Sequence, residues 1–395
     1  MPKMKLSDIG SLSRGKSKHR PRNDKILYGG KYPFVQTSDI KNANHILQTF
    51  EQTYNEIGLK QSKLWSKNTI CITIAANIAD SAILGFDACF PDSVIGLTVN
   101  DKIANYHYVE YLLQYYKRII QNQSNGTSQE NINLETFEQV YFDIPSLDIQ
   151  NDISNILYSI DKKIELNNKI NSELEHFAKT LYEYWFVQFD FPDENERPYK
   201  SSGGTMVYNE VLKREIPVDW SNCTLNDICE MYQPQTLQED NLIDNGKFFV
   251  YGANGIIGKY NEYNHSESEI AIACRGSSCG ILNRTLPNSW ITGNAMVIKL
   301  KDNEINNEYL YHALNYTNIK GIITGSGQPQ ITRVNLAPVK ILMPNKNIIL
   351  KYCSLIEENV KLRLKNELEN QKLTKLRNFL LPMLMNGQIS IVTTE

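Results

Sequence analysis

The chain has 395 residues, more than one hydrophobic core usually serves, so the sequence predicts at least two domains. Hydrophobic residues make up 41% and charged residues 22%, a balance typical of folded proteins and not of disordered chains. The formal net charge of −3 excludes a uniformly basic nucleic-acid coat. The sequence has no uncharged apolar run of roughly 18–20 residues and no apolar segment in its first ten residues, so we expect a cytoplasmic protein.

The seven cysteines are an odd number and form no Cys-x-x-Cys pair, which disfavours a disulfide framework. Cys274 and Cys279 are close in sequence, but no second pair or histidine cluster stands at zinc-ligand spacing. We interpret both as small buried residues and expect no metal site.

The chain opens with a basic stretch. Residues 1–31 contain nine Lys or Arg against two acids, a local net charge of +7. Clusters of this kind gain counterion-release energy on DNA. The alternative is a solvated arm that only improves solubility.

Two mixed segments of similar pattern follow each other along the chain. In the first, β-like runs at 69–74 and 94–99 precede a helical patch at 106–120. In the second, β-like runs at 269–273 and 295–300 precede a helical patch at 308–317. Short mixed elements of this kind predict the α+β class.

A long helix is predicted between the two segments. From Ile153 onward, apolar residues recur at alternating spacings of four and three, which is a heptad pattern. The helix is expected to start after Pro145 and to close before Pro192, about 40 residues later. Asn167 and Asn171 interrupt the apolar seam; buried polar residues there fix register and partner choice, unless both face water.

A second long helix is predicted from about residue 348 to 386, where Pro382 should kink or fray the end and Gly387 should stop it. Residues 148–196 carry a net charge of −7 and residues 345–380 one of +4. Helices of opposite charge are suited to pack together as a coiled coil, although packing against another protein would use the same features. The expected coiled-coil core comprises Ile153, Leu157, Ile160, Ile164, Leu174, Leu181, Val360, Leu364, Leu368 and Leu376.

An internal repeat of about 200 residues relates the two halves. LSDI at 6–9 matches LNDI at 225–228, and GKY at 30–32 matches GKF at 246–248; INL at 132–134 matches VNL at 334–336. A repeat of this length indicates a duplicated domain. With the Pro/Gly/Ser-rich stretch 192–205 as a linker, we expect four parts: 1–147 and 201–344 as like domains, and 148–200 and 345–395 as helical segments.

Signatures of catalysis are absent from the sequence. GANGIIGKY at 252–260 resembles a phosphate loop, but Ala253 stands where the first Gly belongs and Tyr260 where a Ser or Thr must hold Mg²⁺. No GxGxxG follows a predicted strand, and we find neither an adenine-methyltransferase tetrad nor a metal-nuclease pattern. We therefore expect a chain that is not itself an enzyme and carries no cofactor.

Polar, Gly-rich loops remain as candidate binding elements. They read SNGTSQENI at 124–132, CRGSSCG at 274–280 and GSGQPQIT at 325–332. Their amides and hydroxyls can hydrogen-bond base edges or phosphates, and Arg275 can reach a guanine or a phosphate. Ordinary turn chemistry is the alternative. Specificity for a DNA sequence should lie where the two halves differ, for example Ser38-Asp39 in the first half against Asn254-Gly255 in the second.

Together these stretches resemble the specificity (S) subunits of type I restriction-modification enzymes, over essentially the whole chain. The most specific are YGANGIIG at 251–258, the GSGQPQIT loop that leads to Asn335-Leu336, and IDKKIELNNKINSEL at 160–174; YPFVQTSDI at 32–40 resembles another common start of such a domain. Pro382 is a departure, because an uninterrupted helix is expected there. The resemblance implies two α+β target-recognition domains and two long helices that form an antiparallel coiled coil with pseudo-two-fold symmetry.

The resemblance also implies a function. The chain would be a non-catalytic subunit that reads a bipartite, asymmetric site on double-stranded DNA, with the helix pair holding the two domains at a fixed spacing. Two modification subunits that carry S-adenosylmethionine would methylate adenine, and restriction subunits would join for cleavage. The expected DNA contacts are Arg14, Lys16, Lys18, Arg20, Arg22, Lys31, Gln36, Asn125, Thr127 and Gln129 in the first half, and Tyr251, Asn254, Lys259, Arg275, Ser277, Arg284, Ser326, Gln328, Gln330 and Arg333 in the second.

Three alternatives remain open at this point. A related two-component restriction enzyme can use an S-like chain with a different catalytic partner. A coiled-coil scaffold with two protein-binding domains would show the same helices, and sequence-specific DNA binding would distinguish it. A cryptic nuclease would cut DNA in the presence of Mg²⁺.

Overall fold

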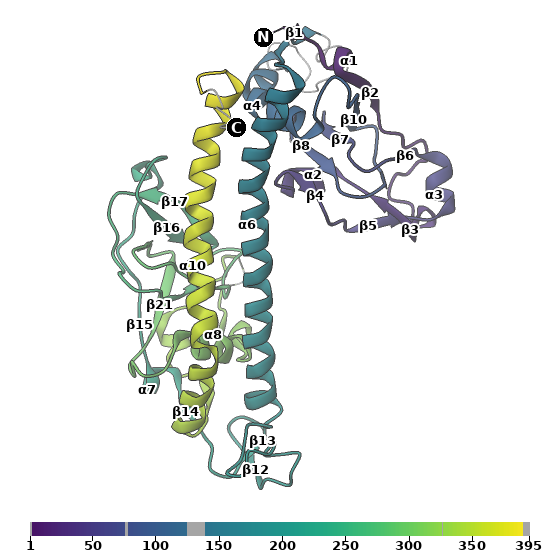
Figure 1. Ribbon diagram of the computed structural model, residues 1–395. Coiled ribbons are helices and arrows are strands. Elements are labelled where there is room, and N and C mark those ends of the chain that lie inside the picture. The colour runs from purple at the N-terminus through teal and green to yellow at the C-terminus, as the bar shows by residue number, and fades with distance from the viewer. Residues whose placement is uncertain (1, 76–77, 125–138, 326, 390–395) are drawn as a thin grey trace. The chain divides into compact units, whose positions relative to one another are not determined.

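The computed structural model describes residues 2–75, 78–124, 139–325 and 327–389 (Figure 1). The chain divides into two compact units. Unit 1 comprises residues 1–167 and 368–395, and unit 2 comprises residues 168–367. Each unit therefore contains a globular part and a portion of both long helices. None of the described helices is long and apolar enough to cross a membrane.

Unit 1 is built on three sheets. The five-stranded sheet has the order β2-β10-β7-β8-β4, the four-stranded sheet has the order β5-β3-β9-β6, and β1 pairs with β11. The strands are β1 (Lys3–Met4), β2 (Gly10–Arg14), β3 (Tyr28–Phe34), β4 (Ile46–Leu47), β5 (Gln52–Tyr54), β6 (Leu64–Trp65), β7 (Ile70–Thr73), β8 (Ser81–Leu84), β9 (Ala88–Cys89), β10 (Val94–Val99) and β11 (Phe142–Asp143). The helices are α1 (Leu6–Ile9), the 3₁₀ turn η1 (Lys25–Leu27), α2 (Thr37–Asn42), α3 (Glu56–Gln61) and α4 (Tyr106–Ser124).

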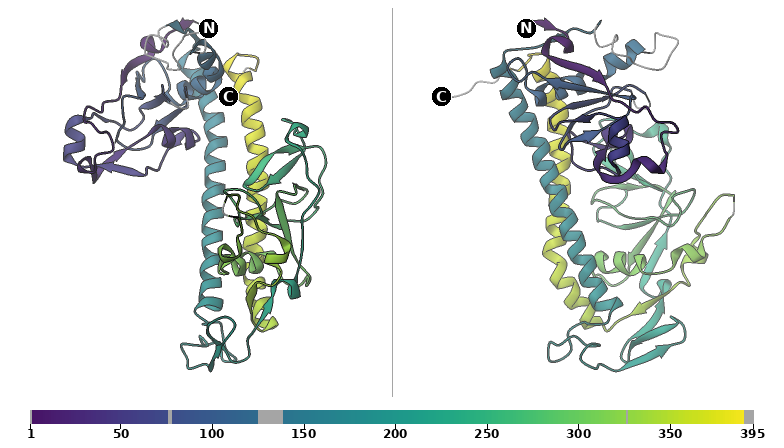
Figure 2. Two further views of the ribbon diagram at one scale, coloured as in Figure 1. Left: turned by 180° about the vertical axis from the view of Figure 1, so that it is seen from behind. Right: turned by 90° about the vertical axis from the view of Figure 1, so that its right-hand side faces the viewer.

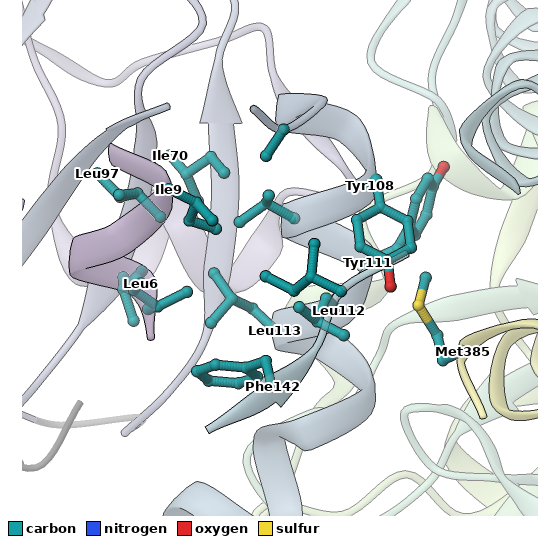
Figure 3. Close-up of a cluster of buried hydrophobic side chains, with 14 of the residues drawn as sticks. Leu6, Ile9, Ile70, Leu97, Tyr108, Tyr111, Leu112, Leu113, Phe142 and Met385 are labelled. Atoms are coloured by element: carbon teal, nitrogen blue, oxygen red, sulfur yellow. The ribbon is translucent and has the colours of Figure 1, made fainter. Parts of the chain in front are cut away.

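The core of unit 1 lies between the five-stranded sheet and helix α4 (Figure 3). Ile70 and Leu97 project from the sheet, and Tyr108 and Leu112 from α4, and all four are fully buried. Burial of one such side chain stabilises the fold by roughly 1.5–3 kcal/mol. Met385 near the end of the second long helix belongs to the same cluster, so this helix is part of the core of unit 1.

Unit 2 repeats most of the strand order of unit 1, without counterparts of β4 and β6. Its sheets have the orders β15-β21-β18-β19 and β17-β16-β20, β14 pairs with β22, and β12 and β13 form a hairpin. The strands are β12 (Met206–Asn209), β13 (Arg214–Pro217), β14 (Ser221–Thr224), β15 (Cys229–Tyr232), β16 (Phe248–Gly252), β17 (Gly255–Tyr260), β18 (Ile270–Ala273), β19 (Leu282–Arg284), β20 (Trp290–Ile291), β21 (Ala295–Leu300) and β22 (Lys340–Met343). The helices are α7 (Leu225–Ile228), η3 (Glu239–Asn241), α8 (Asn307–Asn315), η4 (Ile319–Ile322) and α9 (Arg333–Leu336).

Matching details confirm the internal repeat. The sequence match of 6–9 with 225–228 becomes α1 and α7, and the aspartate at the third position of each helix accepts the same backbone hydrogen bond. Lys5 N–H donates to Asp8 Oδ2 over 2.8 Å, and Thr224 N–H donates to Asp227 Oδ2 over 2.7 Å. One parallel pair also recurs, β3 with β9 and β16 with β20. The predicted class of two duplicated α+β domains is therefore confirmed.

The two long helices were also predicted correctly. Helix α6 spans Leu147–Tyr182 and continues as a π-helical turn, η2 (Glu183–Val187), while α10 spans Lys346–Met385. The expectation that Pro382 frays α10 was wrong, because the helix continues through this residue to Met385. A proline so near the end removes only one helical hydrogen bond. Gly387, at φ 72°, then ends the helix with Gln388 N–H donating to Met383 O.

In unit 1 the two helices run side by side in opposite directions (Figure 2). Asp161 accepts a 2.7 Å hydrogen bond from Arg377, and six residues further along α6 Asn167 donates to Glu369 and Asn370. Asn167 is fully buried, so it lies in the seam and does not face water. The predicted core residues of α6 in this unit, Ile153, Leu157, Ile160 and Ile164, are all buried.

In unit 2 the helices are again antiparallel. Asn171 and Asn366 share a 2.8 Å hydrogen bond, and the Tyr352 hydroxyl donates to the carbonyl of Ala178. Leu174 and Leu364 are half-buried. Leu181 and Val360 pack against a buried cluster that includes Trp185 and Ile356.

Two predicted core positions of α10 were wrong. Leu368 and Leu376 are 39% and 46% exposed. The α10 side chains that contact α6 or the core of unit 1 include Asn366, Asn370, Arg377, Leu380 and Leu384. Three of these five are polar. A search for an apolar stripe passes over such a seam, because its buried positions hold amides and a guanidinium.

A buried polar cluster lies beside the core of unit 1. His45 Nδ1 lies 2.5 Å from Glu110 Oε2, and His45 Nε2 lies 2.7 Å from His107 Nδ1. Glu110 is fully buried and also accepts hydrogen bonds from Ser81 and Gln114. Buried polar groups need such partners, so this cluster ties β8, the segment before β4, and α4 together.

Acidification should destabilise unit 1 through His107. Burial and the neighbouring His45 lower the pKa of His107 to about 4, against about 6.5 in the unfolded chain. Only the unfolded state takes up this proton between those values, so stability falls as the pH drops from 6.5 toward 4, by at most about 3 kcal/mol. Urea unfolding of the full chain at pH 7 and pH 5 measures this.

His107→Gln should reduce the loss of stability at pH 5, because glutamine does not titrate. His176→Gln, on the exposed surface of α6, is the matched control and should keep the wild-type pH dependence. If His107→Gln and wild type lost the same stability between pH 7 and pH 5, His107 would not be the cause of the loss.

Candidate nucleic-acid interface

Two polar loops of unit 2 lie side by side beyond the ends of β18 and β19. The loop 274–280 contacts residues 329–331, since Gly276 N–H donates to Pro329 O and Ile331 N–H donates to Cys274 O, each over 3.0 Å. Arg275 and Gln330 form a β-bridge between them. The structure thus brings together five predicted contacts, all exposed: Arg275, Ser277, Gln328, Gln330 and Arg333. Ser326 lies outside the described residues.

Two further connections of unit 2 join this loop cluster. Gln233, just after β15, donates to Gly293 O over 3.1 Å, and Cys274 N–H donates to Asn294 O over 3.2 Å. Gln233 and Asn294 are exposed amides that the sequence analysis missed. Asn294 directly precedes the predicted strand at 295–300, which was an available signal, whereas no strand was predicted beside Gln233. The cluster presents amide, hydroxyl and guanidinium groups, the side chains that contact base edges and phosphates.

The hairpin of β16 and β17 carries two more predicted contacts. Asn254 is exposed in its two-residue turn, which Gly255 closes at φ 87°, a backbone conformation that favours glycine. Lys259 is half-exposed, and its ammonium group lies 5.5 Å from the Phe249 ring centre. The polar groups of both residues are therefore accessible to a ligand.

Tyr251 is not a surface contact, contrary to the prediction. Its side chain is 5% exposed and packs among Ala271, Ile291 and Val297. Its hydroxyl oxygen accepts a hydrogen bond from the backbone N–H of Leu286, and burial raises the pKa of Tyr251 to about 12. The YGANGIIG motif therefore starts in the core and is exposed at its turn and at Ile256 and Ile257 of β17.

Arg284 was also predicted to contact DNA, but it lies inside an ion-pair network. Its guanidinium bonds Glu308 of α8 over 2.5 Å and Glu175 of α6, and Arg363 of α10 bonds the same two carboxylates. The Arg284 guanidinium also lies 4.0 Å from the Tyr311 ring centre. This network anchors the globular part of unit 2 on its helix pair. The partners are distant in sequence, so nothing near Arg284 in the sequence indicated this network.

The basic stretch of unit 1 is a folded connection between β2 and β3. Gly15 N–H donates to Val94 O, Lys16 N–H to Phe90 O, and the N–H groups of Lys18 and His19 to Gln61 Oε1. The predicted contacts Arg14, Lys16, Lys18, Arg20 and Arg22 are all exposed along it. The stretch is therefore a positioned basic surface and not a loose arm.

Several of these cations already have surface partners. Arg22 lies 2.7 Å from Asp92, Arg20 lies 3.9 Å from the same carboxylate, and Lys31 lies 3.4 Å from Glu56. Exposed ion pairs contribute little, typically about 0–1 kcal/mol, so a phosphate can compete for these cations. Asn125, Thr127 and Gln129 lie outside the described residues.

Arg22 and Gln36 line a cavity of about 750 Å³ in unit 1. Segments 17–29, 34–37 and 91–93 surround it, together with Gln52. Sequence reasoning found two of its residues but not the cavity, because the segments meet only in the folded unit. In the described parts of the chain, no group of three or more His, Cys, Asp or Glu side chains could hold a metal ion.

Comparison with known proteins places the chain in a family. The model of the type I restriction modification DNA specificity domain matches residues 1–176 and 217–376. The chain belongs to this family, and the two matches fall on the two halves of the repeat. It is 23% identical to the type I restriction enzyme MjaIX specificity subunit of Methanocaldococcus jannaschii, over 98% of this chain and 93% of that protein. It is 22% identical to the EcoprrI specificity subunit of Escherichia coli, over 86% of this chain and 82% of that one.

A solved structure has the same fold. The type I restriction-modification S subunit from M. genitalium superposes with a TM-score of 0.61 and 19% identity, covering 99% of this chain and 96% of that one. The fold resemblance extends over both halves and both long helices.

Two arginines of unit 2 should respond differently to substitution. Arg284→Ala leaves the buried Glu308 carboxylate with less compensating charge and should lower the free energy of unfolding by about 3 kcal/mol. Arg275→Ala removes an exposed side chain and should change it by no more than about 0.5 kcal/mol. Urea unfolding of the full chain measures both, and equal stabilities would contradict the structural role of Arg284.

Proposed function

We propose that this chain is the DNA-recognition subunit of a type I restriction-modification complex. Each unit reads one half of a bipartite, asymmetric site on double-stranded DNA, and partner subunits then methylate adenine or cleave. One observation carries the proposal: the same fold occurs twice, and each copy collects basic and polar loops beyond corresponding strand ends. Membership in the specificity-domain family and the likeness to named specificity subunits support it.

Differences between the two copies favour an asymmetric site. The connection between β18 and β19, residues 274–281, reads CRGSSCGI, whereas the corresponding connection between β7 and β8, residues 74–80, reads IAANIAD. One copy therefore carries a guanidinium and hydroxyls in this connection where the other carries an amide and a carboxylate among apolar residues. Different donors and acceptors read different base edges, so two like units recognise two unlike half-sites.

The chain's own role is recognition without catalysis. Its interface residues are arginines, lysines, amides and hydroxyls, which bind and orient DNA. S-adenosylmethionine belongs on the modification subunits. We place the complex in the cytoplasm, with access to DNA.

The long helices are the proposed docking elements for two modification subunits, which restriction subunits then join. Both helices carry large apolar side chains that unit 1 and unit 2 leave exposed, including Phe177 (49%), Leu355 (52%) and Phe379 (56%). Exposed apolar residues grouped along an element mark surfaces that bind other proteins. Because the helices belong to the two halves of the repeat, they offer two similar surfaces to two identical partners.

Methylation mapping tests the function. The chain is co-expressed with the modification subunit from the adjoining gene, and host DNA is examined by single-molecule sequencing. Methylated adenines should be confined to a split motif and should vanish when this chain is omitted. A stable complex that methylates no motif would favour the scaffold function.

Arg275→Ala separates base reading from phosphate binding. If Arg275 reads a base, discrimination at one position should fall by about 1–3 kcal/mol; if it holds a phosphate, affinity should weaken for all sequences alike. Binding of cognate and single-mismatch duplexes at several salt concentrations measures this. Arg197→Ala, an exposed arginine paired with Asp193 in unit 2, is the matched control. Unchanged affinity for every duplex would remove Arg275 from the interface.

A further inference from the structure

The cavity of unit 1 combines groups that suit one nucleotide of DNA. Cations, amides and aromatic rings line its volume of about 750 Å³, among them Arg22, Lys25, Gln36, Gln52, Tyr28 and Phe34. Cations bind phosphate, amides bind base edges, and the rings form a rigid wall. No single segment of the chain provides this combination.

Two of these amides, those of Gln36 and Gln52, are joined to each other. Gln36 Nε2 donates to Gln52 Oε1 over 2.8 Å. This bond uses one of the two donor hydrogens of Gln36 and one lone pair of Gln52. The Gln52 NH₂ group and the Gln36 oxygen remain for a ligand. A donor next to an acceptor complements the edge of adenine in the major groove, where N7 accepts and N6 donates.

The scaffold holds both amides in place. Gln36 stands directly before α2, and its backbone N–H donates to Asp39 Oδ2 over 2.7 Å. Gln52 begins β5 and lies opposite Phe34 of β3 in the sheet. Side chains fixed on regular elements lose little entropy on binding, as base readout requires.

The cations stand at the same cavity. Lys25 is exposed at the start of η1, and the structure gives it no acidic partner among the described residues. Arg22 is held through its carbonyl, which accepts a 2.8 Å hydrogen bond from the Tyr28 hydroxyl, while its guanidinium pairs with Asp92 at the surface. Gly29 has a φ of 82°, and nothing lies within 4 Å of the position a Cβ would take. The cavity is therefore open beside Gly29, where the sugar-phosphate backbone of DNA can approach.

We propose that unit 1 reads an adenine of its half-site in this cavity. Gln36 and Gln52 contact the base edge, and Lys25 and Arg22 contact neighbouring phosphates. The inference rests on the proposed function and adds to it the base and the residues that read it.

Selection from random double-stranded DNA tests the proposal. The probe is a random duplex library, and the protein is the full chain together with the subunits that co-purify with it. Wild type should select a split motif. Gln36→Ala and Gln52→Ala should each lose the preference for adenine at one position of one half, by roughly ten- to hundredfold, and leave the other half unchanged.

Three further variants sharpen the result. Gln48→Ala removes an exposed amide of unit 1 outside the cavity, which bonds Glu165, and should select the wild-type motif. Gln52→Glu is nearly isosteric and replaces the donor with acceptors, so the preference should shift from adenine toward cytosine, whose N4 donates. Lys25→Ala should weaken binding to all sequences alike. It should also lower the slope of log K against log salt concentration by about one.

The outcomes separate the two proposals. If wild type selects no motif, the proposed function fails. If wild type selects a motif but Gln52→Ala and Gln52→Glu keep it at every position, the cavity does not read a base and this inference is overturned while the function stands. Uniform weakening by Gln36→Ala and Gln52→Ala would also overturn it. Thermal unfolding of each variant identifies any loss of binding that comes from misfolding. If an alanine variant is unstable, the selection by the near-isosteric Gln52→Glu decides whether the cavity reads a base.

Discussion

Buried polar contacts between the long helices and the globular parts are the constraint on which both units depend. In unit 1, Asp161 of α6 bonds Arg377 of α10 and the Tyr111 hydroxyl of α4. In unit 2, Glu175 of α6 and Arg363 of α10 join Glu308 and Arg284. A buried charge without its partner costs several kcal/mol, so each network permits few alternative positions of the globular part on its helices. Apolar packing alone tolerates small rotations and shifts far better.

This constraint explains why the seam of α10 is so polar. Asn366, Asn370 and Arg377 occupy positions that leucines would fill in a seam built for stability. A polar residue in such a position lowers stability and penalises every register in which it lacks its partner. A protein that holds DNA-reading loops gains from a defined register, because a displaced loop would meet the wrong base. Stability is instead supplied by the apolar clusters of each unit, such as that of Ile70, Leu97 and Leu112.

Much of the fold could be predicted because its signals are local. The strand at 94–99 was predicted with its observed bounds, as was that at 295–300, since each is a short apolar run between polar turns. The long helices followed from periodicity, and the duplication from motifs at equal spacing. Leu368 and Leu376 were misplaced because the true seam holds amides and a guanidinium, which periodicity of apolar residues does not detect. Tyr251 and Arg284 were misjudged because burial and ion pairing depend on residues far away in the chain.

The candidate site was predictable as a set of loops but not as a surface. Arg275 and Gln330 are 55 positions apart, and only the hydrogen bonds around Cys274 and Pro329 bring them together. Gln36 and Gln52 were separated in the sequence by a helix and a strand, and nothing in their spacing shows that their amides meet. Such residues lie on a common scaffold whose sheets are specified by apolar residues elsewhere. The exposed loop residues are therefore free to differ between the two copies, and one fold can serve two different half-sites.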